Sequence, residues 1–263
     1  EFIAKNSKDP GSYVATLTRR LSQERIDLNW LEPYLDPIWE KYASAPSVVM
    51  AKAVYKKRQG EDKEACRAAL SVLPGNGLVF RQKDLSWFSD NEDFATTAAD
   101  ICWSVMPEKS QRILETVIDS DPSSTVARLM YGKILARSGH ADLALEQIHE
   151  AIDIDPDSPT VLYNAGELAV ECKDFELAKK LFNNYITAGQ SKNPRHDWSL
   201  DDVWLHLAMV YDNLKDYVAE AKALARYNPK QNASDIHIQE AAAWVKAGEP
   251  DTAEAVLFNA IEK

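Results

Sequence analysis

The sequence predicts an all-α protein, a right-handed α–α superhelix of stacked helical pairs. Aspartate-proline pairs recur 34 residues apart, at Asp121-Pro122 and Asp155-Pro156, each after a similar acidic and apolar phrase. Between the two prolines lie two stretches with helical apolar spacing, which meet at a turn around Gly139. A period of about 20–50 residues that holds one supersecondary unit is typical of a solenoid.

Residues 125–158 show the repeat most clearly. Small residues stand at Gly132, Ala144 and Ala151, and Pro156 closes the unit. With Thr125 as position 1, this pattern resembles the tetratricopeptide repeat (TPR) in its small, alanine and proline positions. The resemblance implies a TPR-like solenoid of about five to six helical pairs, each of which buries its apolar face against its neighbours, and a role in binding other proteins.

Residues 1–45 lack the repeat, but Tyr13, Leu17 and Leu21 lie four apart and would form one helical stripe. We expect an N-terminal helical cap or a divergent repeat there, because the terminal pair of a solenoid would otherwise expose its apolar face to water. The repeat domain is then expected over residues 46–263.

Within this domain the expected units are 46–79, 91–124, 125–158, 159–192, 201–233 and 234–263. Pro107 is expected to begin a helix, where its missing N–H costs nothing. Residues 73–90 and 189–200 break the spacing and are expected to form longer loops. Four small residues are expected to let the paired helices approach closely, namely Gly132, Gly166, Ala208 and Ala241.

A solenoid of helical pairs has a concave groove, lined mainly by the first helix of each pair. By resemblance to TPR proteins, we predict a partner-binding groove formed by Leu129, Met130, Lys133, Arg137, Tyr163, Asn164, Glu167 and Glu171. Basic side chains on one helix and acidic ones on the next would favour an extended peptide or a helix that carries both signs of charge. In the alternative interpretation, Leu129 and Tyr163 pack between helices and the charges form a solvated face.

TPR proteins that bind chaperones grip a C-terminal carboxylate with lysine, asparagine and arginine residues on three consecutive first helices. Asn164 matches one of these places. Leu129 stands where lysine is expected, and Asp202 and His206 stand where lysine and arginine belong. Binding to the EEVD tails of heat-shock chaperones is therefore not expected.

The charge balance and the motifs argue against several other functions. With 30 basic and 41 acidic residues the net charge is −11, the wrong sign for a general phosphate-backbone binder. No apolar run reaches the roughly 18 residues of a membrane span. The sequence has no His-Glu-x-x-His pair, nucleophile elbow or phosphate-binding loop. We therefore predict no catalytic residue, no metal ligand and no cofactor.

Cys66, Cys102 and Cys172 form no Cys-x-x-Cys pair and are expected to be reduced thiols. The leading Glu1-Phe2 is what a common cloning site leaves after translation. The main hypothesis is a non-catalytic scaffold for another protein, with the cytoplasm favoured. The alternative is a regulatory or targeting TPR module excised from a larger enzyme or membrane-associated assembly.

Overall fold

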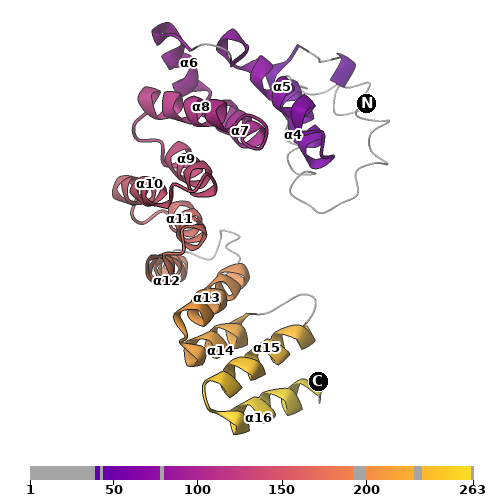
Figure 1. Ribbon diagram of the computed structural model, residues 1–263, viewed down its shortest axis with the longest axis vertical. Helices are drawn as coiled ribbons and strands as arrows, with labels where there is room; N and C mark the ends of the chain where they lie inside the picture. Colours follow the sequence, from indigo (N-terminus) through magenta and orange to yellow (C-terminus); the bar gives the residue numbers. More distant parts are fainter. Residues whose placement is uncertain (1–38, 42–43, 78–79, 192–199, 228–232, 262–263) are drawn as a thin grey trace. The chain divides into compact units, whose positions relative to one another are not determined.

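The computed structural model describes residues 39–41, 44–77, 80–191, 200–227 and 233–261. These residues form helices and no strand (Figure 1). The expected N-terminal cap therefore lies almost entirely outside the described residues. The chain forms two compact units, residues 1–134 and 135–263, and the boundary falls inside helix α9 (Thr125–Arg137). Each unit is described by itself.

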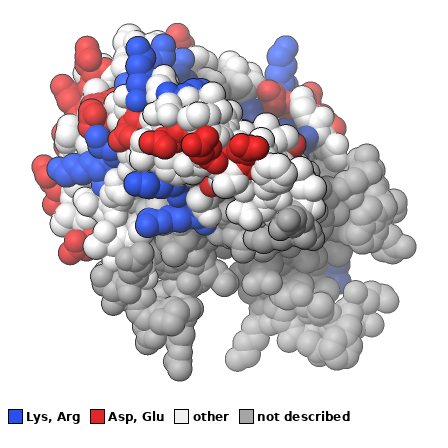
Figure 2. Space-filling view, turned by 90° about the horizontal axis from the view of Figure 1, so that it is seen from below, with Lys and Arg blue, Asp and Glu red and all other residues white. Residues whose placement is uncertain are grey.

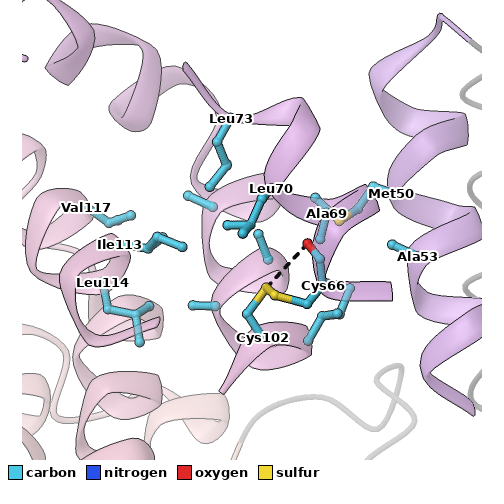
Figure 3. Packing of buried hydrophobic residues seen from close by; sticks show 14 of the residues in the cluster. Met50, Ala53, Cys66, Ala69, Leu70, Leu73, Cys102, Ile113, Leu114 and Val117 are labelled. Atoms are coloured by element: carbon cyan, nitrogen blue, oxygen red, sulfur yellow. Dashed lines mark hydrogen bonds between the residues drawn. A yellow bond between two sulfur atoms is a disulfide. The ribbon is translucent and has the colours of Figure 1, made fainter. Parts of the chain in front are cut away.

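The first unit contains α4 (Pro46–Arg58), α5 (Asp62–Val72), α6 (Leu85–Asp90), α7 (Glu92–Cys102), α8 (Pro107–Ser120) and the first part of α9. Helix α5 contacts both α4 and α7, and α7 packs on α8. Figure 3 shows α5 residues such as Leu70 between Ile113 of α8 and Met50 of α4. Ile113, Leu114 and Val117 are fully buried, and burying a side chain of this size stabilises the fold by about 1.5–3 kcal/mol.

A disulfide joins Cys66 of α5 to Cys102 of α7, with the two Cα atoms 4.7 Å apart. Both cysteines are buried in the core of the first unit (Figure 3). The Cys102 Sγ also lies 3.5 Å from the Cys66 carbonyl oxygen. A sulfur atom in a disulfide has no hydrogen, so this contact is a hydrogen bond only when the two cysteines are reduced. The expectation that all three cysteines are reduced thiols is therefore wrong for this pair, because the packing of α5 on α7 brings together residues that are 36 apart in sequence.

The expectation of a plain loop over residues 73–90 is also wrong. This segment contains two short 3₁₀ turns, Pro74–Gly77 and Gln82–Asp84, followed by α6. Phe88 of α6 is fully buried, and its ring lies 4.8 Å from that of Phe80 and 5.3 Å from that of Trp87. These aromatic contacts offset the cost of ordering a helix that is too short to be stable alone.

The second unit contains the end of α9, α10 (Ala141–Ile154), α11 (Pro159–Glu171), α12 (Phe175–Ser191), α13 (Leu200–Leu214), α14 (Tyr217–Arg226), α15 (Ala233–Lys246) and α16 (Pro250–Ile261). Helices that follow one another in the chain pack against each other from α10 to α16. Pro107 and Pro159 stand in the first turn of α8 and α11, as expected from the missing N–H of proline.

One type of turn links the helices of five pairs. It places a residue with positive φ after the first helix, at Gly60, Gly139, Lys173, Lys215 and Gly248. The N–H of the next residue donates to the carbonyl five residues earlier, at 2.9–3.0 Å. This arrangement satisfies the last carbonyls of a helix and favours glycine, which has no Cβ to clash in the left-handed conformation. The turn predicted around Gly139 is therefore confirmed, and Gly60 and Gly248 stand at the same place in their own pairs.

Gly166 of α11 lies directly against α12. A Cβ atom built at Gly166 would be 2.6 Å from Cε1 of Phe182, whose side chain is fully buried. Ala208 and Ala241 are also buried, each 4% exposed. The expectation that small residues permit close approach is therefore confirmed at Gly166, where no side chain fits without a shift of the Phe182 ring.

Candidate partner-binding surface

The predicted groove residues on α9 differ in exposure. Leu129 is only 8% exposed, and Met130 is half-buried against the core of the first unit. Lys133 is exposed in the first unit, and Arg137 is exposed in the second. The burial of Leu129 favours the interpretation in which this side chain packs between helices.

Arg137 and Glu171 come together as an ion pair. The Arg137 guanidinium lies 3.4 Å from the Glu171 carboxylate, and about a third of each side chain is exposed. The two residues are 34 apart in sequence, so the spacing places them at equivalent positions of successive repeats. An ion pair at the surface contributes roughly 0–1 kcal/mol. A charged partner could therefore replace either member at little cost to the fold.

Tyr163 of α11 is half-buried among aromatic rings. Its ring centroid lies 6.1 Å from that of Phe182, 5.4 Å from Tyr185 and 5.7 Å from His206. Burial, followed by the charge of Glu167, raises the pKa of Tyr163 to about 12. The hydroxyl is therefore protonated at neutral pH, and the ring contributes chiefly to packing.

Glu167 links α11 to α13 through His206. Its carboxylate lies 3.4 Å from Nε2 of His206, while Nδ1 of that ring lies 2.8 Å from the backbone carbonyl oxygen of Asp202. The hydrogen bond with Glu167 is the largest cause of a raised pKa at His206, and burial opposes it. Both nitrogens of the protonated His206 ring therefore face oxygen acceptors. Asn164, which precedes Glu167 by three residues on α11, is exposed.

The predicted polar residues of the second unit thus form a surface strip on the first helices. We call Arg137, Asn164, Glu167 and Glu171 the first-helix strip. Two members form an ion pair with each other, and Glu167 is bound to His206. The strip offers hydrogen-bond donors and acceptors of both charges.

A cavity between α13, α14 and α15 was not anticipated from the sequence. Its volume is about 420 Å³, and it is lined by Leu205, His206, Ala208, Met209, Asp212, Glu220, Leu224 and Gln239. The α13 residues Leu205, Ala208, Met209 and Asp212 follow the helical spacing of three and four, which is the one sequence signal that groups them. Leu205 is 38% exposed and Met209 is 43% exposed, so this apolar floor is open to solvent.

Two carboxylates at this cavity share one ammonium group. The Nζ atom of Lys246 lies 2.7 Å from Oδ1 of Asp212 and 3.7 Å from Oε1 of Glu220. Glu220 is 8% exposed, and no described residue donates a hydrogen bond to its Oε2 atom. Burial raises the pKa of Glu220, an effect that Lys246 opposes and Asp212 reinforces. The cavity therefore has an under-satisfied acidic wall.

The described residues include no group of three or more histidine, cysteine, aspartate or glutamate side chains placed to hold a metal ion. None of the described helices has the length and apolar character of a membrane span. In Figure 2, acidic and basic side chains lie next to one another over the described part of the visible face. Such a mixed face suits polar contacts with another protein better than it suits a polyanion.

Comparisons with known proteins identify the fold. No family profile and no curated protein sequence matches this chain. Among solved structures, the Cut9–Hcn1 hetero-tetramer of the APC/C aligns over 97% of this chain and 46% of its own, with 16% identity and a TM-score of 0.59. PilF of Pseudomonas aeruginosa aligns over 81% of this chain and 89% of its own, with 15% identity and a TM-score of 0.51.

MamA of MSR-1 aligns over 68% of this chain and 95% of its own, with 20% identity and a TM-score of 0.50. All three are TPR proteins. Together with the helical pairs and their shared turn, these likenesses show that the chain has the TPR-type all-α fold that its sequence predicts.

Proposed function

We propose that this chain, which has a TPR-type fold, is a non-catalytic scaffold that binds an extended or helical segment of another protein along the first-helix strip. The observation that carries the proposal is the placement of Arg137, Asn164, Glu167 and Glu171 at the surface, while Val161, Leu162 and Ala165 of α11 are buried. Polar groups held on rigid helices bind a partner with little ordering cost.

The partner segment would carry both signs of charge. An acidic partner side chain would pair with Arg137, and a basic one with Glu171 or Glu167, at the cost of one weak surface pair. Opposite charges would set the register of the segment, and apolar contacts would contribute most of the affinity.

A charge swap separates binding from stability. We expect Arg137→Glu to weaken the binding of a partner recovered from the source cells. The loss in binding free energy should be about 1–3 kcal/mol if the contact is desolvated, and less than about 1 kcal/mol if Arg137 lies at the solvent-exposed rim of the interface. The double variant R137E/E171R restores the intramolecular ion pair with reversed polarity. Its unfolding should match that of the wild type, yet its partner binding should stay weak, as measured by calorimetric titration.

Glu146→Lys on the second helix α10 is the matched control, because Glu146 is exposed and lies outside the strip. It should leave the affinity unchanged. A partner that responds to Glu146→Lys but not to Arg137→Glu would contradict the proposal.

The disulfide indicates that the protein works in an oxidising compartment. Disulfides are maintained in oxidising environments and are rare in the cytosol, so the bond between Cys66 and Cys102 argues against the cytoplasm as the site of action. Alkylation with a maleimide under denaturing conditions should label one cysteine, Cys172, in protein taken from its native source. Labelling of all three would contradict this assignment.

A further inference from the structure

We propose that the cavity between α13, α14 and α15 binds a lysine or arginine side chain that a partner protein presents next to an apolar residue. This proposal rests on the general role of a protein-binding scaffold but not on the first-helix strip, which lies on other residues.

The floor of the cavity suits the stem of a long basic side chain. Leu205, Met209 and Leu224 line it, and the first two are more than a third exposed. Lysine and arginine bury their methylene stems on apolar surface while the charged group stays at a polar site. Methionine adapts its shape to different occupants because its side chain is unbranched and flexible.

The wall of the cavity suits a cationic group. Asp212 and Glu220 carry two formal negative charges, and Lys246 supplies one positive charge to both. When both acids are ionised, this trio has a net charge of −1. The remaining ionisable group of the lining, His206, already faces Glu167. An incoming cation is therefore attracted, and a carboxylate is repelled.

The Glu220 carboxylate offers a hydrogen-bond acceptor to the cationic group. A buried carboxylate oxygen without a hydrogen-bond donor costs free energy, which an ammonium or guanidinium donor would recover. The Oε2 atom is in this state among the described residues, and only 11% of the Glu220 side chain is exposed. The terminal torsion of glutamate has two equivalent broad wells, so a half-turn would present the unsatisfied oxygen to the occupant in place of Oε1.

Selection from a library of random peptides displayed on phage tests this proposal on the full 263-residue chain. Peptides enriched on the wild type should carry lysine or arginine beside an apolar residue. A synthetic copy of the leading peptide should bind Glu220→Gln at least tenfold more weakly, because the substitution removes the charge and keeps the shape. The control Glu254→Gln, at an exposed position of α16, should bind like the wild type.

Lys246→Gln provides a readout that a purely structural role of Glu220 would not produce. It removes the ammonium that competes for Asp212 and Glu220, so the same basic peptide should bind several-fold more tightly. The circular dichroism and melting temperature of each variant confirm that it is folded.

Four outcomes would overturn the proposal: no enriched peptide, enriched acidic peptides, equal binding to wild type and Glu220→Gln, or weaker binding to Lys246→Gln. Self-association of the chain that Glu220→Gln abolishes would also overturn it, because the occupant would then be a second copy rather than a partner. Arg137→Glu should leave the peptide affinity unchanged. Failure of this site is therefore distinguishable from failure of the first-helix strip.

Discussion

Gly166→Ala should destabilise the second unit, although the same change in an ordinary helix stabilises it. Alanine is favoured over glycine in a helix interior by about 1 kcal/mol. At Gly166, however, the new Cβ would lie 2.6, 2.9 and 3.0 Å from three carbon atoms of the Phe182 ring. Carbon atoms attract optimally at about 3.5–4.0 Å, so either the ring or the helix must move.

The Phe182 ring has little room to yield. It is fully buried, and its centroid lies 6.1 Å from that of Tyr163 and 5.4 Å from that of His206. Overpacking of a rigid site costs typically about 1–3 kcal/mol. After subtraction of the gain in helix propensity, the net loss for Gly166→Ala is about 0–2 kcal/mol.

A double-mutant cycle with Phe182→Leu separates the two contributions. Leucine lacks Cε1 and Cζ, which lie 2.6 and 3.0 Å from a Cβ at position 166, and its Cδ methyl groups are free to turn away from the 2.9 Å position of Cδ1. In this background Gly166→Ala should therefore stabilise the protein by up to about 1 kcal/mol. The expected coupling is about 1–3 kcal/mol. Urea unfolding followed by circular dichroism gives the four free energies, and hydrogen exchange in α11 and α12 locates the change.

Gly60→Ala is the control for the cycle. Gly60 has a φ of +80° and no atom within 4 Å of a Cβ built on it, so its cost is backbone strain and should be equal with and without Phe182→Leu. If Gly166→Ala were stabilising with Phe182 in place, the close approach of α11 and α12 would not limit the size of residue 166, and the reasoning would be refuted.

Two further predictions concern side-chain pairs within each unit. Replacing Cys66 and Cys102 together by alanine should lower the stability of the first unit by about 2–4 kcal/mol, since the cross-link closes a loop of 36 residues; unchanged urea midpoints in oxidised and reduced protein would contradict this. The raised pKa of His206 means that its interaction with Glu167 stabilises the fold below the ordinary pKa of about 6.5 and loses this effect as the pH rises through the folded-state value. Glu167→Gln should lower the pKa of His206 in an NMR titration, whereas an unchanged pKa would show that Glu167 is not its cause.

The all-α fold and many local features could be predicted from the sequence because they depend on local chemistry. Proline in a first helical turn, at Pro107, and glycine in a left-handed turn, at Gly139, act on their own backbone. The close approach of helices at Gly166 could be predicted because Gly166 lies 34 residues after Gly132, at the equivalent position of the next repeat. Helix α6 was missed because its contacts with Phe80 are made outside the helix itself, and helical spacing over so few residues carries little signal.

The candidate site divides in the same way. Spacing alone placed Arg137 and Glu171 at equivalent positions of neighbouring repeats, and the structure shows them in contact. The spacing could not show that Leu129 is buried or that three other rings surround Tyr163. Exposure depends on which helices pack around a residue, and periodicity shows only the face on which it stands.

The sequence by itself determined the fold class, the helical pairs and the turns between them, because these arise from apolar periodicity and the backbone preferences of glycine and proline. Only the tertiary structure decided the Cys66–Cys102 pairing, which depends on how α5 lies on α7. It also decided the cavity at Glu220, an acidic residue that looks ordinary in sequence. The burial of Glu220 and its distance from Lys246 are set jointly by α13, α14 and α15, and the register between separate helices is not encoded in the spacing of any one of them.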